Sequence, residues 1–313
     1  MKRLLLLGAM LAAAVRGGGL PLTNLPATVK WALHDDVRAL RASPLGEKVM
    51  AAIPGSPAEA KIRAFAALTS IDLQRDVDAI TLCGSGGPEQ GALVYLAGRW
   101  DLPRLNAIVA GSEEFASKTE GRHTLMNWKD GKPHAGSGRQ HACFVSTNLA
   151  VLADREEALR QALVALDGEA PALNSVRRFH ELSAAGGRGF ASLAAIDVNT
   201  LVAADPNAAW LQQVETVRLD VRSDAEGVRF ELALCAAGPE VAQQVQQVLA
   251  GFQSLAMLQG LKNPDLARIA QSARIGAADR NVSASLAIPM DLVTRALARS
   301  RVRAAPPPPP DGE

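Results

Sequence analysis

The chain has 313 residues, of which 48% are apolar and 21% are charged, and its 33 basic side chains nearly balance its 32 acidic ones. This composition excludes a wholly disordered chain, which requires low hydrophobicity and a high net charge. A formal charge of +1 gives no electrostatic basis for binding nucleic acid, whose phosphates attract clustered Lys and Arg. Three cysteines are too few for a disulfide scaffold, and the length fits two domains or one large one.

The chain begins with the features of a signal peptide. Lys2 and Arg3 precede an unbroken apolar run over residues 4–14, which ends in small side chains suited to a cleavage site. The run is too short to span a bilayer as a helix, which needs about 20 residues. Residues 1–20 are therefore predicted to be a signal peptide, with a buried N-terminal helix as the alternative. The mature chain is expected to be periplasmic or secreted and to have no transmembrane segment.

The elements of the first half follow in chain order. Residues 31–36 predict a strand, and Ser43-Pro44 is typical of a helix start because a capping side chain precedes a proline. Strands are predicted at 77–82 and 91–98, and Pro103 begins an amphipathic helix. Two strands, at 123–128 and 141–152, and a helix over 154–166 complete this half.

The second half repeats this order. Its first strand runs into Asp197-Val198-x-x-Leu201, as the earlier one runs into Asp36-Val37-x-x-Leu40, and Pro239 stands where Pro103 stood. The remaining predicted elements are strands at 214–219, 227–234, 273–278 and 282–288, helix starts at Asp205-Pro206 and Pro239, and a last helix from 291 to about 301.

This organisation predicts an α+β fold of two tandem repeats, each ordered strand-helix-strand-strand-helix-strand-strand-helix. Each repeat is expected to form its own mostly antiparallel sheet of about four strands, with helices on one face. The first repeat spans residues 24–170 and the second 171–303. Residues 304–313 contain five consecutive prolines and are predicted to be a disordered Pro-rich tail, with a docking peptide as the alternative.

The segment over residues 36–46, with the sequence DVRALRASPLG, carries a resemblance together with the helix around Phe65 and the strand at 77–82. It is similar to a group of exported bacterial proteins of unknown function that have a signal peptide and two tandem α+β repeats. The resemblance covers most of residues 25–300 and implies the architecture. It carries no catalytic residues.

Sequence motifs for catalysis are absent. The glycine-rich segment 84–91 leads into a strand instead of a helix, and no Gly-Lys-Ser/Thr occurs, so it is predicted to be a hairpin turn and not a phosphate loop. Neighbouring carboxylates such as Asp35 and Asp36 diverge on a strand, so they are predicted to be solvated or to begin a helix. The sequence therefore predicts no catalytic, cofactor-binding or metal site.

One cluster of residues contains the side chains that a metal site would need. His123, His134, His141 and Cys143 fall within 21 residues, and His141 and Cys143 share one face of a strand. Their spacing matches no known ligand pattern, so exposed histidines on an edge hairpin are the expected outcome. A Cys83–Cys143 disulfide is left open, because an exported protein meets an oxidising compartment.

Two classes of function remain. The first is a non-enzymatic binding or envelope-accessory protein, with an unknown protein or small ligand in the cell envelope as its partner and no nucleic acid. The alternative is a hydrolase or a metal-assisted enzyme with a site near His123, His141 and Asp36, since catalytic groups need only meet in space.

Overall fold

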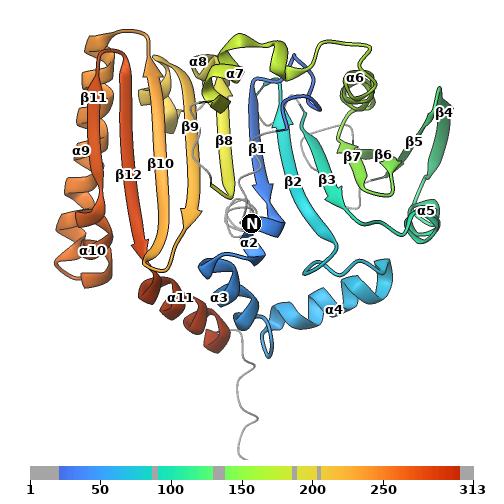
Figure 1. Cartoon of the computed structure of the whole chain (residues 1–313), viewed down its shortest axis with the longest axis horizontal. Coiled ribbons are helices and arrows are strands. Elements are labelled where there is room, and N and C mark those ends of the chain that lie inside the picture. The colour runs from blue at the N-terminus through green and yellow to red at the C-terminus, as the bar shows by residue number, and fades with distance from the viewer. Residues whose placement is uncertain (1–20, 87–90, 130–137, 185–188, 203–205, 304–313) are drawn as a thin grey trace, which may run out of the picture.

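The computed structural model describes residues 21–86, 91–129, 138–184, 189–202 and 206–303. Twelve strands form one antiparallel sheet, in the order β11-β12-β10-β9-β8-β1-β2-β3-β7-β6-β5-β4 (Figure 1). The strands are β1 (Trp31–Asp36), β2 (Val77–Gly84), β3 (Leu93–Gly98), β4 (Ala116–Glu120), β5 (His123–Lys129), β6 (Arg139–Ser146), β7 (Leu149–Ala153), β8 (Ala191–Ile196), β9 (Val214–Ser223), β10 (Gly227–Ala236), β11 (Arg274–Ala278) and β12 (Asn281–Pro289).

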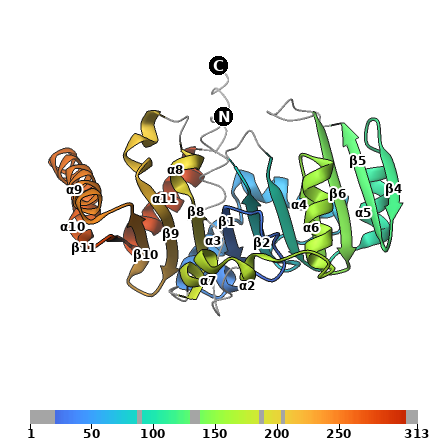
Figure 2. The same cartoon turned by 90° about the horizontal axis from the view of Figure 1, so that it is seen from above.

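Helices surround the sheet (Figure 2). They are α2 (Val37–Arg41), α3 (Pro44–Ala52), α4 (Pro57–Thr69), α5 (Leu102–Ala110), α6 (Glu156–Leu166), α7 (Arg177–Ala184), α8 (Val198–Leu201), α9 (Pro239–Gly260), α10 (Pro264–Ser272) and α11 (Met290–Arg303), with short 3-10 turns η1 (Leu173–Ser175) and η2 (Pro206–Leu211). The predicted helix starts are confirmed where capping side chains act. The Ser43 side chain accepts from the N–H of Gly46 at the start of α3, and Asp36 accepts from Ala39 at the start of α2.

The α+β class is confirmed, but the expectation that each repeat forms its own sheet is wrong. The first strands of the two repeats, β1 and β8, pair antiparallel at the centre, with Ala32 opposite Ala194 and Leu33 opposite Leu193. Both alanines are almost fully buried. A buried strand edge without a partner would leave main-chain N–H and C=O groups unsatisfied. Pairing β1 with β8 satisfies them and merges the repeats into one sheet.

The two halves of this sheet have the same strand order, read outward from the centre. The order is β1-β2-β3-β7-β6 in the first half and β8-β9-β10-β12-β11 in the second. The hairpin β6–β7 therefore corresponds to β11–β12, and the predicted strand at 141–152 is divided by a turn at residues 147–148. The hairpin β4–β5, which contains the predicted strand at 123–128, is an addition at the outer edge of the first half.

The sheet has two distinct faces, which we name after the helices that pack on them. The α6 face is covered in the first half by α6 and at the centre by α7. Leu159 on α6 and Phe179 on α7 pack in one apolar cluster with Ala32 and Ala194. The α9 face is covered in the second half by α9 and α10. Leu173 and Phe179 belong to the segment assigned to the second repeat, yet they pack in the cluster that holds the core of the first.

Candidate functional site

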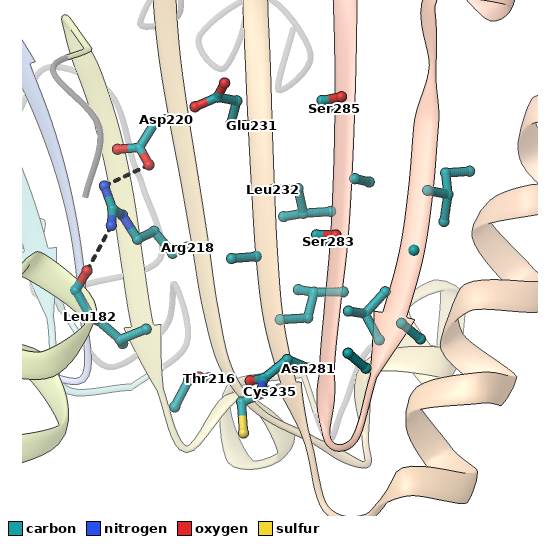
Figure 3. Close-up of a pocket in the computed structure, with 18 of the residues that line it drawn as sticks. Leu182, Thr216, Arg218, Asp220, Glu231, Leu232, Cys235, Asn281, Ser283 and Ser285 are labelled. Atoms are coloured by element: carbon teal, nitrogen blue, oxygen red, sulfur yellow. Dashed lines mark hydrogen bonds and ion pairs between the residues drawn. The ribbon is translucent and has the colours of Figure 1, made fainter. Parts of the chain in front are cut away.

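Beyond β9, against which α7 is held, the α6 face of the second half carries no described helix and forms a groove, which we call the sheet groove. The strand register places three rows of side chains across β9, β10, β12 and β11 on this face. Figure 3 shows most of these side chains. The rows are Thr216-Cys235-Asn281-Ala278, Arg218-Ala233-Ser283-Gly276 and Asp220-Glu231-Ser285-Arg274.

The groove is open because the last helix of each repeat takes a different course. In the first half, α6 follows β7 and lies on the α6 face, where Leu159 and Leu163 are buried. In the second half, α11 follows β12 but packs against α3, and its Val293 contacts the cluster around Leu40 and Val221. The place that α6 occupies on one half therefore has no helix of this chain on the other, within the described residues.

A buried ion pair fixes one wall of the groove. Arg218 and Asp220 lie on neighbouring outward positions of β9, and each is less than a tenth exposed. Nη2 of Arg218 lies 2.6 Å from Oδ2 of Asp220, and Nη1 donates to the main-chain oxygen of Leu182 at 2.9 Å. Arg218 thus holds the end of α7 against the sheet, because a C-terminal carbonyl of a helix accepts well from a cation.

Further ion pairs surround the groove. Arg178 on α7 binds Asp197 at 2.8 Å and Glu215 at 3.1 Å, and Arg280 binds Glu215 at 2.7 Å. Across the floor, Glu231 pairs with Arg222. The charged groups of the rim are therefore largely neutralised by each other, so the groove presents mixed polarity and no strong field of one sign.

The lining of the groove mixes polar and aliphatic side chains. Its volume is about 1050 Å³, and it combines aliphatic residues such as Leu182 and Leu232 with small, hydroxyl and charged ones. Neither a histidine nor an aromatic ring is among the described residues that line it. Ala233 and Ser283 are exposed on its floor.

His123 and Cys143, two of the predicted cluster, do come together in the first half. Nδ1 of His123 lies 3.9 Å from Sγ of Cys143, and Nε2 lies 2.9 Å from Oδ2 of Asp167 at the end of α6. Arg122 also binds Asp167. Burial opposes ionisation of Asp167, but hydrogen bonds from His123 and Arg122 outweigh it and lower the pKa of that carboxyl.

This cluster has the residue types of a thiol nucleophile, but not the accessibility. Cys143 is fully buried in the core cluster, and burial raises the pKa of its thiol to about 11. A nucleophilic cysteine needs a lowered pKa and a path for substrate. His123 itself is 7% exposed, so the expectation of exposed histidines on this hairpin is wrong for it. His123 can be buried because the carboxylate of Asp167, at the end of α6, is a hydrogen-bond partner for its ring.

Of the remaining candidate residues, His141 lies beside Cys143 on β6, whereas Asp36 is distant. His141 is buried on the same face of β6 as Cys143, and burial lowers the pKa of its ring. Asp36 caps α2 at the end of β1, with β2, β3 and β7 between it and β6. The proposed grouping of His123, His141 and Asp36 is therefore not assembled. His134 lies outside the described residues, within which no group of potential ligands could hold a metal ion.

The Cys83–Cys143 disulfide is not formed, since both thiols are free. Cys83 is on β2 and Cys143 on β6, so β3 and β7 separate them in the sheet. Both cysteines were predicted to lie on strands of the first repeat, but the order of those strands in the sheet could not be predicted from the sequence. Cys235, in contrast, is half-buried and lines the sheet groove.

Asp35 also departs from the sequence expectation. It was predicted to be solvated or to begin a helix, as its neighbour Asp36 does, but it is only 2% exposed. It lies on the α9 face between Ile80 and Ala191. Burial raises the pKa of its carboxyl to about 7, and Oδ1 has no hydrogen-bond partner in the described part of the chain.

Sequence reasoning missed the sheet groove, although a signal for it exists. Along β9, Thr216, Arg218 and Asp220 alternate with Val217 and Leu219. Such alternation indicates a strand with one apolar and one polar face. In the structure, however, Thr216, Arg218 and Asp220 are each less than a tenth exposed, and the exposed floor of the groove includes Ala233 and Ser283 on β10 and β12.

Comparison with known proteins does not assign a function. No protein-family model matches the chain, and no curated protein matches it. Among solved structures, crystal form III of TP0453 is 11% identical with a TM-score of 0.49, and covers 90% of this chain and 98% of its own. Crystal form I of the same protein is 11% identical with a TM-score of 0.48, and the match covers 91% of this chain and 99% of the other. Crystal form IV is 12% identical with a TM-score of 0.48, and the match covers 92% of this chain and 98% of the other. The likeness carries no argument about activity.

None of the described helices combines the length and the apolar composition that crossing a bilayer demands.

Proposed function

We propose that this protein is an exported, non-enzymatic binding protein of the cell envelope whose sheet groove receives a segment of another protein. The observation that carries the proposal is the uncovered α6 face of the second half, beside a first half whose same face is closed by α6. The N-terminal apolar run supports export to the periplasm or the exterior, and the resemblance to exported two-repeat proteins agrees with it.

The chemistry of the groove favours a polypeptide over a small ligand. Its volume of about 1050 Å³ lies at the upper end of the range for small-molecule pockets, and it is a broad floor with one wall rather than an enclosed cavity. Small side chains at Ala233, Ser283 and Gly276 allow close approach, and Asn281 and Ser285 offer hydrogen bonds. Specificity would come from shape and hydrogen bonding, because the rim charges are already paired.

The test is site-specific photo-crosslinking in the cells that export the protein. A benzophenone amino acid is introduced at Ser283, on the exposed floor of the groove, and at Ala60, an exposed position of α4, as the control. The expected result is one adduct with a defined envelope protein from position 283 and none from position 60. Absence of an adduct at 283, or the same adducts from both positions, would contradict the proposal.

A second variant separates binding from export. Ala233→Arg places a long side chain across the middle row of the floor, whereas Ala60→Arg adds the same side chain to α4. Loss of the adduct with Ala233→Arg alone supports the groove as the binding surface. N-terminal sequencing of the envelope-fraction protein tests export independently, because cleavage near residue 20 is expected.

A further inference from the structure

A second cavity lies on the other face of the sheet from the sheet groove, and we call it the α9 cavity. It lies between the α9 face of the second half and the helices α9 and α10, which Figure 1 shows at the end of the sheet that carries β11. Its volume is about 430 Å³, within the range of small-molecule sites. The strand register places Leu219, Ala284 and Ile275 in one row of its floor, across β9, β10, β12 and β11. Because neighbouring strands are about 4.8 Å apart, the α9 cavity is a slot about 14 Å long.

Hydrogen bonds fix the two helices that form the roof of this cavity. Nε2 of Gln253 on α9 donates to the main-chain oxygens of Ala270, at 2.9 Å, and Ala273, at 3.4 Å, where α10 ends. The hydroxyl of Ser272 donates to the main-chain oxygen of Ala287 on β12 and accepts from its N–H, both at 2.9 Å. The roof is therefore bound within itself and to the sheet, as in a preformed ligand site.

The second repeat builds the α9 cavity from helices of its own. In the first repeat, β3 is followed by α5, of 9 residues, and then by the hairpin β4–β5. In the second, β10 is followed by α9, of 22 residues, and then by α10. Gly260 allows these two helices to meet closely, because a Cβ there would lie 2.7 Å from that of Ala267. The cavity is thus a feature of one repeat and not a consequence of the duplicated strand order.

The lining of the α9 cavity is almost wholly hydrocarbon. Its leucine, isoleucine and phenylalanine side chains, Leu249 and Phe230 among them, are each only partly buried. Gln253 and Ser285 are the only polar residues among the described ones that line it. The amide N–H groups of Gln253 are directed to α10, and Ser285 belongs to a row of the sheet groove on the other face. A ligand in this cavity must therefore gain its affinity by burying hydrocarbon.

We propose that the α9 cavity binds one unbranched hydrocarbon chain, such as that of a fatty acid, and leaves the polar head group of the ligand at its mouth. The long, narrow shape matches a single chain, and the lining has no group that could compensate a buried charge. A free fatty acid and the acyl chain of a phospholipid offer the same chemistry to this slot. The site is independent of the function proposed above, because the sheet groove lies on the opposite face.

Calorimetric titration with chains of increasing length tests the proposal. The probes are octanoate, decanoate and dodecanoate, each below its micelle concentration. Each buried methylene is worth about fourfold in affinity, so dodecanoate is expected to bind roughly 200-fold more tightly than octanoate. Dodecylphosphocholine presents the same chain on a phospholipid head group. Equal binding of this probe would support a phospholipid source, and its exclusion would support a free fatty acid. Affinity that does not rise with chain length would overturn the proposal.

Two neighbouring residues of β12 provide matched variants. Ala284→Phe fills the α9 cavity and is expected to abolish dodecanoate binding, whereas Ser283→Phe places the same ring in the sheet groove and is expected to preserve it. If circular dichroism shows that Ala284→Phe does not fold, Ala256→Phe fills the cavity from α9, with Ala250→Phe on the exposed side of that helix as its control. Dodecanoate binding that survives the filling variant, or that is lost equally in its control, would contradict the proposal.

Discussion

At the scale of single residues, Asp35 is an acid in an unfavourable place. Its carboxyl is almost fully buried on β1 between Ile80 and Ala191, and burial raises its pKa to about 7. A buried acid of this kind is stable when neutral and costly when ionised. The fold therefore tolerates Asp35 at the expense of stability at high pH.

The sign of this effect follows from the two pKa values. Below the ordinary pKa of 3.8, the carboxyl is protonated in both states and has no effect. As the pH rises toward the folded pKa of about 7, the unfolded chain ionises first, so the free energy of unfolding falls. The full loss is roughly 4 kcal/mol at complete ionisation, since each pKa unit is worth about 1.4 kcal/mol.

Asp35→Asn is expected to remove this loss while keeping the shape of the side chain. Urea unfolding of the variant and the native chain should give free energies that diverge from about pH 4 to pH 8, with the variant the more stable at the upper end. Asp279→Asn in the exposed β11–β12 turn serves as the control. Parallel pH profiles for Asp35→Asn and the native chain would show that Asp35 is solvated.

The three cysteines are expected to differ in reactivity, which also tests the enzyme alternative. Burial raises the pKa of the Cys83 thiol to about 12 and that of Cys143 to about 11, whereas Cys235 is half-buried at the groove. A thiol-specific reagent should modify Cys235 alone in the folded protein and all three after unfolding. Rapid modification of Cys143 in the folded protein would revive a thiol nucleophile next to His123.

At the scale of elements, two helical glycines have opposite roles. A Cβ on Gly46, in α3, would come 1.7 Å from the main-chain oxygen of Leu40, so α3 can approach α2 only with glycine there. A Cβ on Gly251, in the exposed part of α9, would meet nothing within 4 Å. The first glycine is required by packing, and the second only weakens its helix.

Alanine at these two positions should therefore change stability in opposite directions. Gly46→Ala is expected to lower the free energy of unfolding by about 3 kcal/mol, because the main chain must shift. Gly251→Ala is expected to raise it by up to about 1 kcal/mol through helix propensity. Thermal or urea unfolding measures both, and a neutral Gly46→Ala would show that α2 and α3 are not in close contact.

The element types were accessible from the sequence, because local patterns encode them. Alternation predicted β10, Pro239 predicted the start of α9, and Ser43-Pro44 predicted α3. The register between distant strands has no local signal, so neither the β1–β8 junction nor the separation of Cys83 from Cys143 was predicted. The hairpin β4–β5 also obscured the equivalence of β6–β7 and β11–β12.

The candidate site was less accessible than the fold. The alternation that places Arg218 and Asp220 on one face of β9 is visible in the sequence, but that face of the sheet becomes a groove only when the following helix packs elsewhere. The position of α11 depends on its contacts with α3, which lies nearly 250 residues earlier in the chain. The sequence also indicated His123 and Cys143 without showing that α6 would bury them.

At the scale of the whole molecule, the junction of β1 and β8 determines how the protein unfolds. Its residues are shared by both halves, and the cluster around Ala32 and Ala194 contains side chains from both repeats. Neither half can keep this cluster without the other. The two repeats should therefore behave as one cooperative unit, although their strand order is duplicated.

Differential scanning calorimetry of the protein tests this claim most directly. One continuous sheet predicts a single transition whose calorimetric enthalpy equals its van't Hoff enthalpy. Two resolved transitions, each accounting for one repeat, would contradict the shared sheet and the open groove that follows from it.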